Sequence, residues 1–161
     1  MIKNIFKKNK NSDIIISPAA GKIIPIENVK DEVFSSKMMG DGFAVEPIEN
    51  EIKIPVSGKI SMLYPSLHAF GIETANGVNI LVHIGIDTVC LNGKGFQSMI
   101  KENQKVNAGE TAIIADFDFI KKQGYGITVM VIVTDIGIFD TLTKNLEIPN
   151  EVLTLSSNNP I

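Results

Sequence analysis

The sequence predicts an all-β fold: an antiparallel β-sandwich or barrel-sandwich with two short helices. Its apolar runs are short, and turn residues such as Pro18, Pro55 and Asn76-Gly77 separate them at close intervals. Only two segments read as helices, and neither is long enough to form a helical layer. Many short strands with frequent turns are typical of a sandwich or barrel.

Ten strands and two helices are expected along the chain. The strands are predicted at residues 14–17, 21–25, 42–45, 51–54, 58–63, 69–74, 78–84, 111–115, 129–133 and 152–155. A first helix is predicted at residues 96–102, where Phe96, Met99 and Ile100 share one side. A second is predicted at residues 117–122, with Asp116 at its N-cap position and Gly124 just past its end.

The length and composition fit one folded domain, expected at residues 14–161. Hydrophobic residues make up 44% of the 161 residues, which is enough to build a core. Residues 1–13 are expected to form a flexible tail, because terminal residues are often poorly ordered. The tail mixes Ile2, Ile5 and Phe6 with lysines. A membrane-surface helix is therefore the alternative, and the expected membrane contact is at most peripheral.

Several features favour a cytoplasmic protein that does not bind nucleic acid. The N-terminus lacks the apolar region of a secretory signal, and no apolar run reaches the ~18 residues of a spanning helix. Cys90 is the only cysteine, which excludes an internal disulfide and fits a reducing compartment; it is expected to be a small buried apolar residue. The net charge is −3 and all 15 basic residues are lysines, so arginine contacts to phosphate or nucleic acid are absent.

The chain has two histidines, and the predicted hairpin brings them together. If Asn76-Gly77 forms a two-residue turn, Phe70 pairs with His83 and His68 pairs with Gly85. His68 and His83 then share one face as diagonal neighbours, about 7–8 Å apart at Cα. A register shift of one residue would place them on opposite faces. Core histidines with satisfied hydrogen bonds are the alternative interpretation.

Two adjacent imidazoles suit phosphoryl transfer. A neutral imidazole nitrogen is a nucleophile near neutral pH, and two close imidazoles resist double protonation. One histidine could therefore attack while the other stabilises developing charge. Zinc is a second use for such a pair, but a catalytic zinc site usually needs a third protein ligand. Asp87 would lie about 13 Å along the strand from His83, too far without a bend.

Several motifs together resemble one known family. They are 16–21 (ISPAAG), 33–42 (VFSSKMMGDG), 54–60 (IPVSGKI), 68–70 (HAF), 82–89 (VHIGIDTV), 91–96 (LNGKGF) and 104–109 (QKVNAG). The chain resembles the glucose-class enzyme IIA components of the bacterial phosphoenolpyruvate-dependent sugar phosphotransferase system. The similarity extends from about residue 14 to residue 133 and fades beyond it.

The resemblance implies a phosphocarrier with a sandwich of antiparallel sheets and no required cofactor. Such a protein accepts a phosphoryl group from the histidine phosphocarrier protein and passes it to a cysteine on the enzyme IIB domain of a sugar permease. His83 matches the phosphorylated histidine, with Nε2 as the attacking atom, and His68 matches the second active-site histidine. Ser66 stands where the family often has a threonine that orients this second histidine. A backbone carbonyl near Gly85 is expected to fix the tautomer of His83.

The family also implies an apolar docking surface around the histidines. The matching positions are Val33, Phe34, Met38, Met39, Tyr64, Leu81 and Val89. Ordinary core packing is the alternative for each of them. Asp31, Glu32 and Asp87 are expected to form an acidic rim that favours a basic partner surface.

Two other functions are compatible with the same residues. A regulatory binding protein would dock metabolic enzymes or transporters on this surface, under the control of its phosphorylation state. In that case His68 and His83 are expected to share a zinc ion with a carboxylate of the partner. A zinc hydrolase on a similar scaffold would require a third protein ligand, which the sequence does not show.

Overall fold

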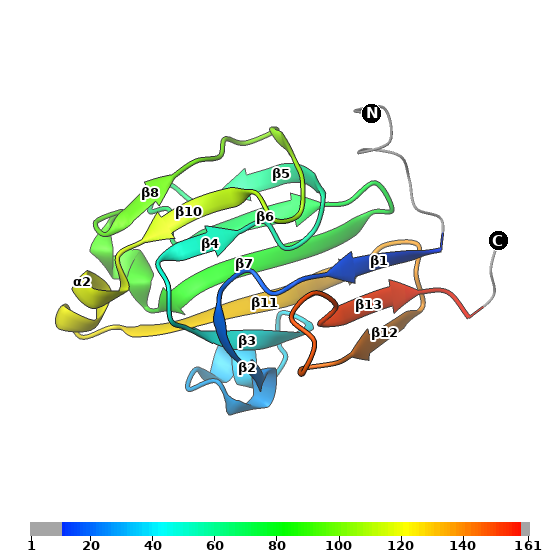
Figure 1. The fold of residues 1–161 in the computed structure, drawn as a ribbon, viewed down its shortest axis with the longest axis horizontal. Helices are drawn as coiled ribbons and strands as arrows, with labels where there is room; N and C mark the ends of the chain where they lie inside the picture. The colour runs from blue at the N-terminus through cyan, green and yellow to red at the C-terminus, as the bar shows by residue number, and fades with distance from the viewer. Residues whose placement is uncertain (1–10, 159–161) are drawn as a thin grey trace.

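The computed structural model describes residues 11–158, and its architecture is built from antiparallel β-sheets (Figure 1). Two short α-helices accompany the strands within this range, so the predicted fold class is confirmed. The expected N-terminal tail falls mostly on residues 1–10, which lie outside the described residues. Ser12 and Asp13 were also expected in the tail, but they begin strand β1.

The largest sheet has seven strands and carries both predicted hairpin strands. Its order is β2 (Gly21–Pro25), β3 (Asp41–Pro47), β11 (Gly126–Ile136), β7 (Val78–Ile86), β6 (Ala69–Glu73), β5 (Gly58–Leu63) and β9 (Lys105–Val106). Strand β7 is therefore the central strand, with β11 on one side and β6 on the other. His83 in β7 is paired on both sides, with Met130 of β11 and Ala69 of β6.

Two three-stranded sheets and four short helical segments complete the described part of the chain. One sheet has the order β4 (Glu51–Lys53), β10 (Thr111–Ala115) and β8 (Phe96–Ser98), and the other has the order β1 (Ser12–Ile15), β13 (Leu153–Ser156) and β12 (Thr141–Lys144). The helical segments are α1 (Glu32–Ser35), α2 (Phe117–Lys122) and the 3-10 turns η2 (Ile26–Asn28) and η3 (Thr88–Leu91). Helix α2 has the predicted bounds, and the Asp116 side chain caps it by accepting from the Phe119 N–H.

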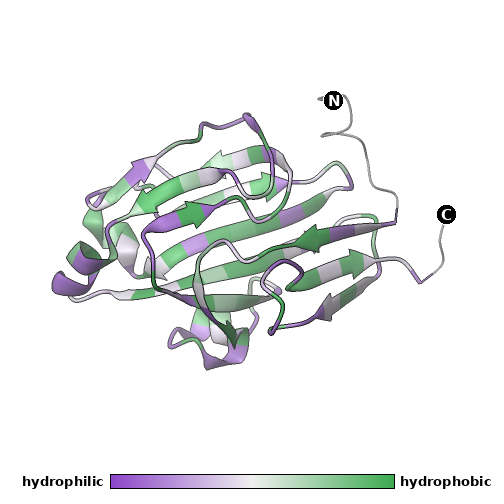
Figure 2. Ribbon diagram, viewed as in Figure 1, coloured by the Kyte–Doolittle hydropathy of each residue, from purple (hydrophilic) through white to green (hydrophobic). Residues whose placement is uncertain are grey.

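The two faces of the large sheet bury two separate clusters, because side chains alternate along each strand. The inner face contributes Phe43, Phe70, Val82 and Val131 to the main core, which the two smaller sheets complete. The outer face buries a smaller cluster beneath η2 and α1; its members are Ile26, Val29, Phe34, Ala44, Ala69, Leu81, Met130 and Ile132. Figure 2 shows hydrophobic residues along much of the central strands and hydrophilic residues mainly in the connections. His83 lies on the outer face, beside this smaller cluster.

The turn between β6 and β7 has three residues rather than the predicted two. The Thr74 N–H donates to the Val78 carbonyl at 2.9 Å, which leaves residues 75–77 in the loop. Gly77, the last of them, has φ +80°. A three-residue hairpin loop with glycine in the left-handed region is a common alternative to a two-residue turn. The Asn-Gly pair thus indicated the hairpin correctly but not its loop length.

This loop shifts the predicted register by one residue. Ala69, and not Phe70, stands opposite His83. Phe70 and Ile72 were expected on the histidine face but belong to the main core on the other face. The pattern of burial enforces this register, since a phenylalanine and an isoleucine gain more from the core than from the outer face.

The predicted helix at residues 96–102 is wrong. Strand β8 occupies its first three residues and pairs with β10, where Phe96 lies opposite Ala115 and Ser98 opposite Ile113. A seven-residue helix is marginal without tertiary support, so cross-strand hydrogen bonds prevail over the local apolar spacing. Strands β9 and β12 and helix α1 were not predicted, and each is only two to four residues long.

Within residues 11–158, none of the helices has the length and hydropathy required to cross a membrane.

Candidate active site

His68 and His83 meet on the outer face of the large sheet, although the register differs from the prediction. Their ring centroids are 5.0 Å apart and the ring planes are nearly perpendicular, at 81°. His83 belongs to β7, whereas His68 lies in the β5–β6 loop, one residue before β6. Leu67 has φ +60°, so the chain turns just before His68. The strict alternation of a strand therefore does not apply to His68, and its ring reaches the His83 face.

A hydrogen bond at the end of β7 fixes the orientation of His83. Its Nδ1 lies 2.9 Å from the carbonyl oxygen of Gly85, as expected from the family resemblance. A carbonyl can only accept, so Nδ1 carries the proton and Nε2 keeps the lone pair of the neutral ring. Gly85 has φ +81°, and a Cβ at this position would lie 2.5 Å from the Cγ2 of Thr88. Both the backbone angle and the space therefore require glycine.

Ser66 contacts the second histidine, also as expected. Its Oγ lies 2.7 Å from Nδ1 of His68. Only 4% of the His68 surface is exposed, and its ring centroid lies 5.3 Å from that of Tyr64. The Tyr64 N–H donates to the Ala69 carbonyl at 3.1 Å and closes the loop that holds both Ser66 and His68. The buried ring thus has a hydrogen-bond partner at Nδ1, which limits the cost of its burial.

Burial keeps both imidazoles neutral near pH 7. Burial, followed by the neighbouring His83, lowers the pKa of His68 to about 4. Burial also lowers the pKa of His83, although the Gly85 carbonyl and the carboxylates of Asp31 and Asp87 oppose this shift. A neutral imidazole retains a nucleophilic nitrogen. The environment therefore favours nucleophilic chemistry at the one ring nitrogen of His83 that has no proton.

The two imidazoles line a hollow of about 290 Å³. The complete lining is Asp31, Val33, Phe34, Met39, Tyr64, His68, Leu81 and His83. Five of the predicted docking residues thus surround the pair. Phe34 and Leu81 are buried, and the Phe34 ring centroid lies 4.9 Å from that of His83. Val33 and Met39 keep 45% and 40% of their surface exposed.

The other predicted docking residues lie outside this lining. Met38 is 76% exposed and Val89 is 50% exposed, and Asp87 is also at the surface. Glu32, from the predicted acidic rim, is exposed as well. Phe34 and Leu81 are thus buried and Tyr64 packs against the same smaller cluster, whereas the other apolar docking residues, Val33, Met38, Met39 and Val89, are exposed.

Cys90 was expected to be buried, and this expectation is wrong because its side chain is exposed. The 3-10 turn η3 buries Thr88 and Leu91. Residues three apart in a 3-10 turn lie on the same side. The two residues between them, Val89 and Cys90, consequently face outward.

Comparison with known proteins identifies the family. Residues 13–137 match the family model described as phosphoenolpyruvate-dependent sugar phosphotransferase system, EIIA 1. The chain belongs to this family. The family resemblance read from the motifs is therefore confirmed.

Individual relatives agree with this EIIA assignment. The glucose-specific EIIA component of the phosphotransferase system from Mycoplasma capricolum is 45% identical over 129 residues, which are 80% of this chain and 83% of the relative. The glucose-specific EIICBA component from Streptococcus pneumoniae is 49% identical over 121 residues, which are 75% of this chain but 17% of that longer protein. The solved structure of glucose permease IIA from Mycoplasma capricolum superposes with a TM-score of 0.83 at 38% identity, covering 92% of this chain and 97% of that one.

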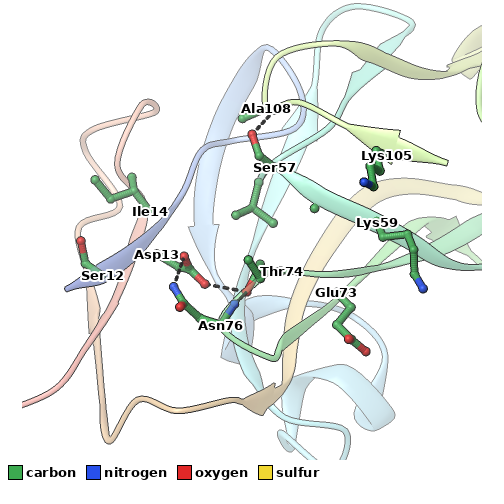
Figure 3. A pocket seen from close by; sticks show the side chains of 13 residues that line it. Ser12, Asp13, Ile14, Ser57, Lys59, Glu73, Thr74, Asn76, Lys105 and Ala108 are labelled. Carbon is green, nitrogen blue, oxygen red and sulfur yellow. Dashed lines mark hydrogen bonds between the residues drawn. The ribbon is translucent and has the colours of Figure 1, made fainter. Parts of the chain in front are cut away.

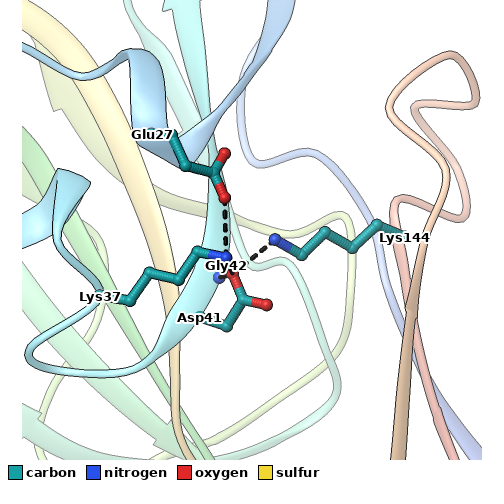
Figure 4. Close-up of polar contacts among 5 residues, drawn as sticks. All are labelled: Glu27, Lys37, Asp41, Gly42 and Lys144. Atoms are coloured by element: carbon teal, nitrogen blue, oxygen red, sulfur yellow. Dashed lines mark hydrogen bonds and ion pairs between the residues drawn. The ribbon is translucent and has the colours of Figure 1, made fainter.

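A network of ion pairs anchors the exposed methionine loop, residues 37–41, of this EIIA protein (Figure 4). At one end of the loop the Lys37 ammonium lies 2.8 Å from Glu27 and 3.6 Å from Asp41. At the other end the Asp41 carboxylate also contacts Lys144 of β12 and accepts from the Gly42 N–H at 2.8 Å. Sequence alone does not predict this network, because Asp41 and Lys144 are 103 positions apart and no local pattern pairs them.

A second cavity, of about 450 Å³, lies away from the histidines (Figure 3). It is bounded by β1, the β6–β7 turn and the edge of β5 and β9. Inside it the Asp13 carboxylate accepts from the Thr74 hydroxyl at 2.7 Å and from the Asn76 amide at 3.0 Å. The two cavities have no lining residue in common, so this cavity is not part of the histidine site.

Metal ligands are sparse in the described part of the chain. Among residues 11–158, no three His, Cys, Asp or Glu side chains are grouped closely enough to hold a metal ion. His68 and His83 supply two ring nitrogens, whereas a catalytic zinc site usually has three protein ligands. A zinc hydrolase therefore finds no support in the described residues.

We expect NMR titration to show both imidazoles with pKa values below the ordinary histidine value of about 6.5, and His68 with a pKa of about 4. In the unfolded chain both histidines keep the ordinary pKa, so between pH 6.5 and 4 the unfolded chain binds more protons than the folded protein does. The free energy of unfolding must then rise with pH across this window and fall on acidification. In His68→Gln the loss of unfolding free energy on acidification to pH 4 should be smaller by on the order of 1–3 kcal/mol. Urea denaturation measures this difference. Ordinary titration of both rings would contradict this account.

Proposed function

We propose that this EIIA protein is a phosphocarrier in which His83 accepts a phosphoryl group from the histidine phosphocarrier protein and passes it to a cysteine of an enzyme IIB domain. The observation that carries the proposal is the His83–Gly85 hydrogen bond, because it leaves Nε2 as an unprotonated nucleophile beside a second histidine. Membership of the EIIA family supports a role in sugar phosphotransfer. Exchange with such a carrier places the proposed role in the cytoplasm.

The transfer requires no change in the protonation of His83 Nδ1. Nε2 forms a bond to phosphorus while the phosphorus–nitrogen bond of the donor's phosphohistidine breaks, and the electron pair of that bond returns to the donor imidazole. The Nδ1 proton stays in its hydrogen bond to Gly85 throughout. In the second step the acceptor thiolate attacks phosphorus, the bond to Nε2 breaks, and its electron pair returns to Nε2.

His68 is the residue that we propose to stabilise the group in transfer. If the Ser66 hydroxyl donates to Nδ1, Nε2 of His68 carries the proton and can donate to a phosphoryl oxygen. A pKa of about 4 makes His68 a neutral donor at pH 7. Hydrogen bonds from neutral donors are weaker than those from charged ones, which suits a phosphoryl group that must leave again.

The partners are proposed from the surface around the hollow and from the relatives. Exposed Val33, Met38, Met39 and Val89 offer an apolar surface, and methionine adapts to more than one partner. The acidic rim favours basic partner surfaces. The pneumococcal relative combines EIIC, EIIB and EIIA in its name, which supports a IIB domain as the acceptor. The relatives are named glucose-specific, so a glucose permease is the acceptor to test first.

A regulatory binding role at the same surface is the second proposal. The two neutral imidazoles facing one hollow favour it. Nε2 of His83 has a lone pair, and Nε2 of His68 gains one when the Nδ1–H of His68 donates to the Ser66 hydroxyl. The two nitrogens then suit a zinc ion completed by a carboxylate of the bound partner. Phosphorylation of His83 would block this zinc site and so release the partner. Zinc would be titrated calorimetrically into the isolated protein and into its complex with a bound partner. Zinc binding only in the complex would separate this role from phosphate transfer, which we propose to need no cofactor.

His83→Ala should abolish phosphorylation, because the only proposed acceptor nitrogen is removed. The measurement combines phosphoenolpyruvate, enzyme I and the histidine phosphocarrier protein, and mass spectrometry then follows an acid-labile gain of one phosphate. Cys90→Ser is the matched control, since Cys90 directly follows the motif that contains His83 and is exposed; this variant should be labelled normally. Normal labelling of folded His83→Ala would refute the assignment.

His68→Ala, which removes the imidazole donor, should still take up phosphate but transfer it to the IIB cysteine about 10²–10³ times more slowly, the loss typical of one removed charge-stabilising donor. Rapid-quench transfer kinetics with purified phosphorylated protein measure this rate. Transfer at the wild-type rate would rule out a stabilising role for His68.

Met39→Lys should raise the KM for the phosphorylated donor about tenfold or more, because it places a charge in the apolar docking surface opposite a basic partner. Ile48→Lys is the control, since Ile48 is 78% exposed and does not line the hollow. The unfolding free energy of Met39→Lys should stay within about 0.5 kcal/mol of the wild type. A large loss of stability with an unchanged KM would show that Met39 serves packing.

A further inference from the structure

We propose that Thr88 is a positioning residue for both histidines, because its hydroxyl holds the Ile84–Gly85 segment that contacts each of them. The inference rests on the proposed function of His83 and adds a residue that does not touch the phosphoryl group. Thr88 is fully buried, with 0% of its surface exposed. It lies in η3, three residues after Gly85.

The Thr88 hydroxyl is joined to the His68 backbone through one residue. Its Oγ1 donates to the Ile84 carbonyl at 2.5 Å. The Ile84 N–H in turn donates to the His68 carbonyl at 2.7 Å. Ile84 itself is fully buried in the main core. A displacement of the Ile84 peptide would therefore move the backbone of His68.

The same threonine also packs on the residue that orients His83. The Thr88 Cγ2 would lie 2.5 Å from a Cβ on Gly85, so the methyl group rests directly against the Gly85 Cα. The Gly85 carbonyl accepts the Nδ1–H of His83. One side chain thus holds the peptide before Gly85 with its hydroxyl and Gly85 itself with its methyl group.

The backbone ladder alone does not hold this segment. Ile84 pairs with Val129 and Ile86 pairs with Gly126, so the register of β7 on β11 is interrupted around Gly85. The turn also contains Asp87 at φ +61°, a left-handed conformation that is unfavourable for a non-glycine residue. A side-chain hydrogen bond across four residues stabilises this turn where regular pairing is absent.

The Thr88 hydrogen bond is expected to influence which tautomer His83 adopts. Loss of the Thr88 hydrogen bond would loosen the Gly85 carbonyl and weaken the Nδ1–H···O=C contact. The ring could then place its proton on Nε2, and a protonated Nε2 has no lone pair for phosphorus. Thr88 would therefore act on the rate of phosphoryl uptake and not on the binding of partners.

Two substitutions at Thr88 separate the hydroxyl from the space it fills. Thr88→Val keeps the shape and removes the donor, whereas Thr88→Ser keeps the donor and removes the methyl group. Thr74→Val is the matched control, because Thr74 is also buried and its hydroxyl donates to Asp13 at 2.7 Å in the second cavity, away from the histidines. If Thr88→Val does not fold, Thr88→Cys, with its weaker S–H donor, replaces it in the comparison.

Imidazole ¹⁵N NMR shifts at pH 7.5 measure the tautomer of His83. The single-turnover rate of phosphorylation is measured in parallel. In Thr88→Val we expect the ratio of Nδ1–H to Nε2–H tautomers to fall about fivefold to tenfold, the size expected for one hydrogen bond. The phosphorylation rate should fall in proportion to the fraction of His83 that keeps the Nδ1–H tautomer, with an unchanged KM for the donor. Thr74→Val should resemble the wild type in both measurements. Thr88→Ser, which loses only the methyl contact, should change the tautomer ratio less than Thr88→Val does.

An unchanged tautomer ratio in folded Thr88→Val or Thr88→Cys would overturn the proposal. So would an equal shift in Thr88→Ser, because the hydroxyl would then not be the cause. The tautomer measurement does not depend on phosphate transfer. If the wild type takes up no phosphate on His83 while the tautomer still responds to Thr88, the proposed function fails and the positioning role stands.

Discussion

The hydrogen bond from His83 Nδ1–H to the Gly85 carbonyl is the constraint on which the active site depends. It assigns the proton to one ring nitrogen and leaves the lone pair on the other. It also requires the chain to leave the regular β7 conformation two residues after the histidine, with Gly85 at φ +81°. His83 nevertheless stays on the central strand, paired with Met130 on one side and Ala69 on the other. The central strand therefore sets the position of His83, while its orientation comes from the irregular turn that follows.

Burial has one favourable and one unfavourable effect on the two imidazoles. It lowers the pKa of both imidazoles, which keeps them neutral, but it would also leave polar ring nitrogens without hydrogen bonds. The site avoids this cost because Gly85 and Ser66 each satisfy one Nδ1. Phe34 and Leu81 supply the apolar surroundings without filling the hollow. In the proposed function, the second nitrogen of each ring then serves the phosphoryl group.

The sequence predicted the strands and the histidine pair because both depend on short-range patterns. Apolar alternation and turn residues located the β-structure, and the motif around His83 indicated the site. The register failed because Asn76-Gly77 specifies a turn but not its length, and burial of Phe70 decided between two- and three-residue loops. The prediction of a helix at residues 96–102 failed because the pairing of Phe96 and Ser98 with β10 cannot be recognised in a local stretch of sequence. The left-handed backbone conformation of Leu67 brings His68 to the face of His83, and no sequence pattern indicates this conformation.

The docking surface combines mobile side chains with a fixed backbone. Met38 and Met39 are flexible and exposed, which helps one surface to fit both a donor and an acceptor. A loop that was itself flexible would lose conformational entropy at each encounter, and affinity would fall. Ion pairs from Glu27, Asp41 and Lys144 hold the two ends of this loop. Exposed ion pairs add little to stability, so their effect here is better understood as orientation. In the proposed function, strand β12, which provides Lys144, therefore supports docking although it lies in a different sheet from His83.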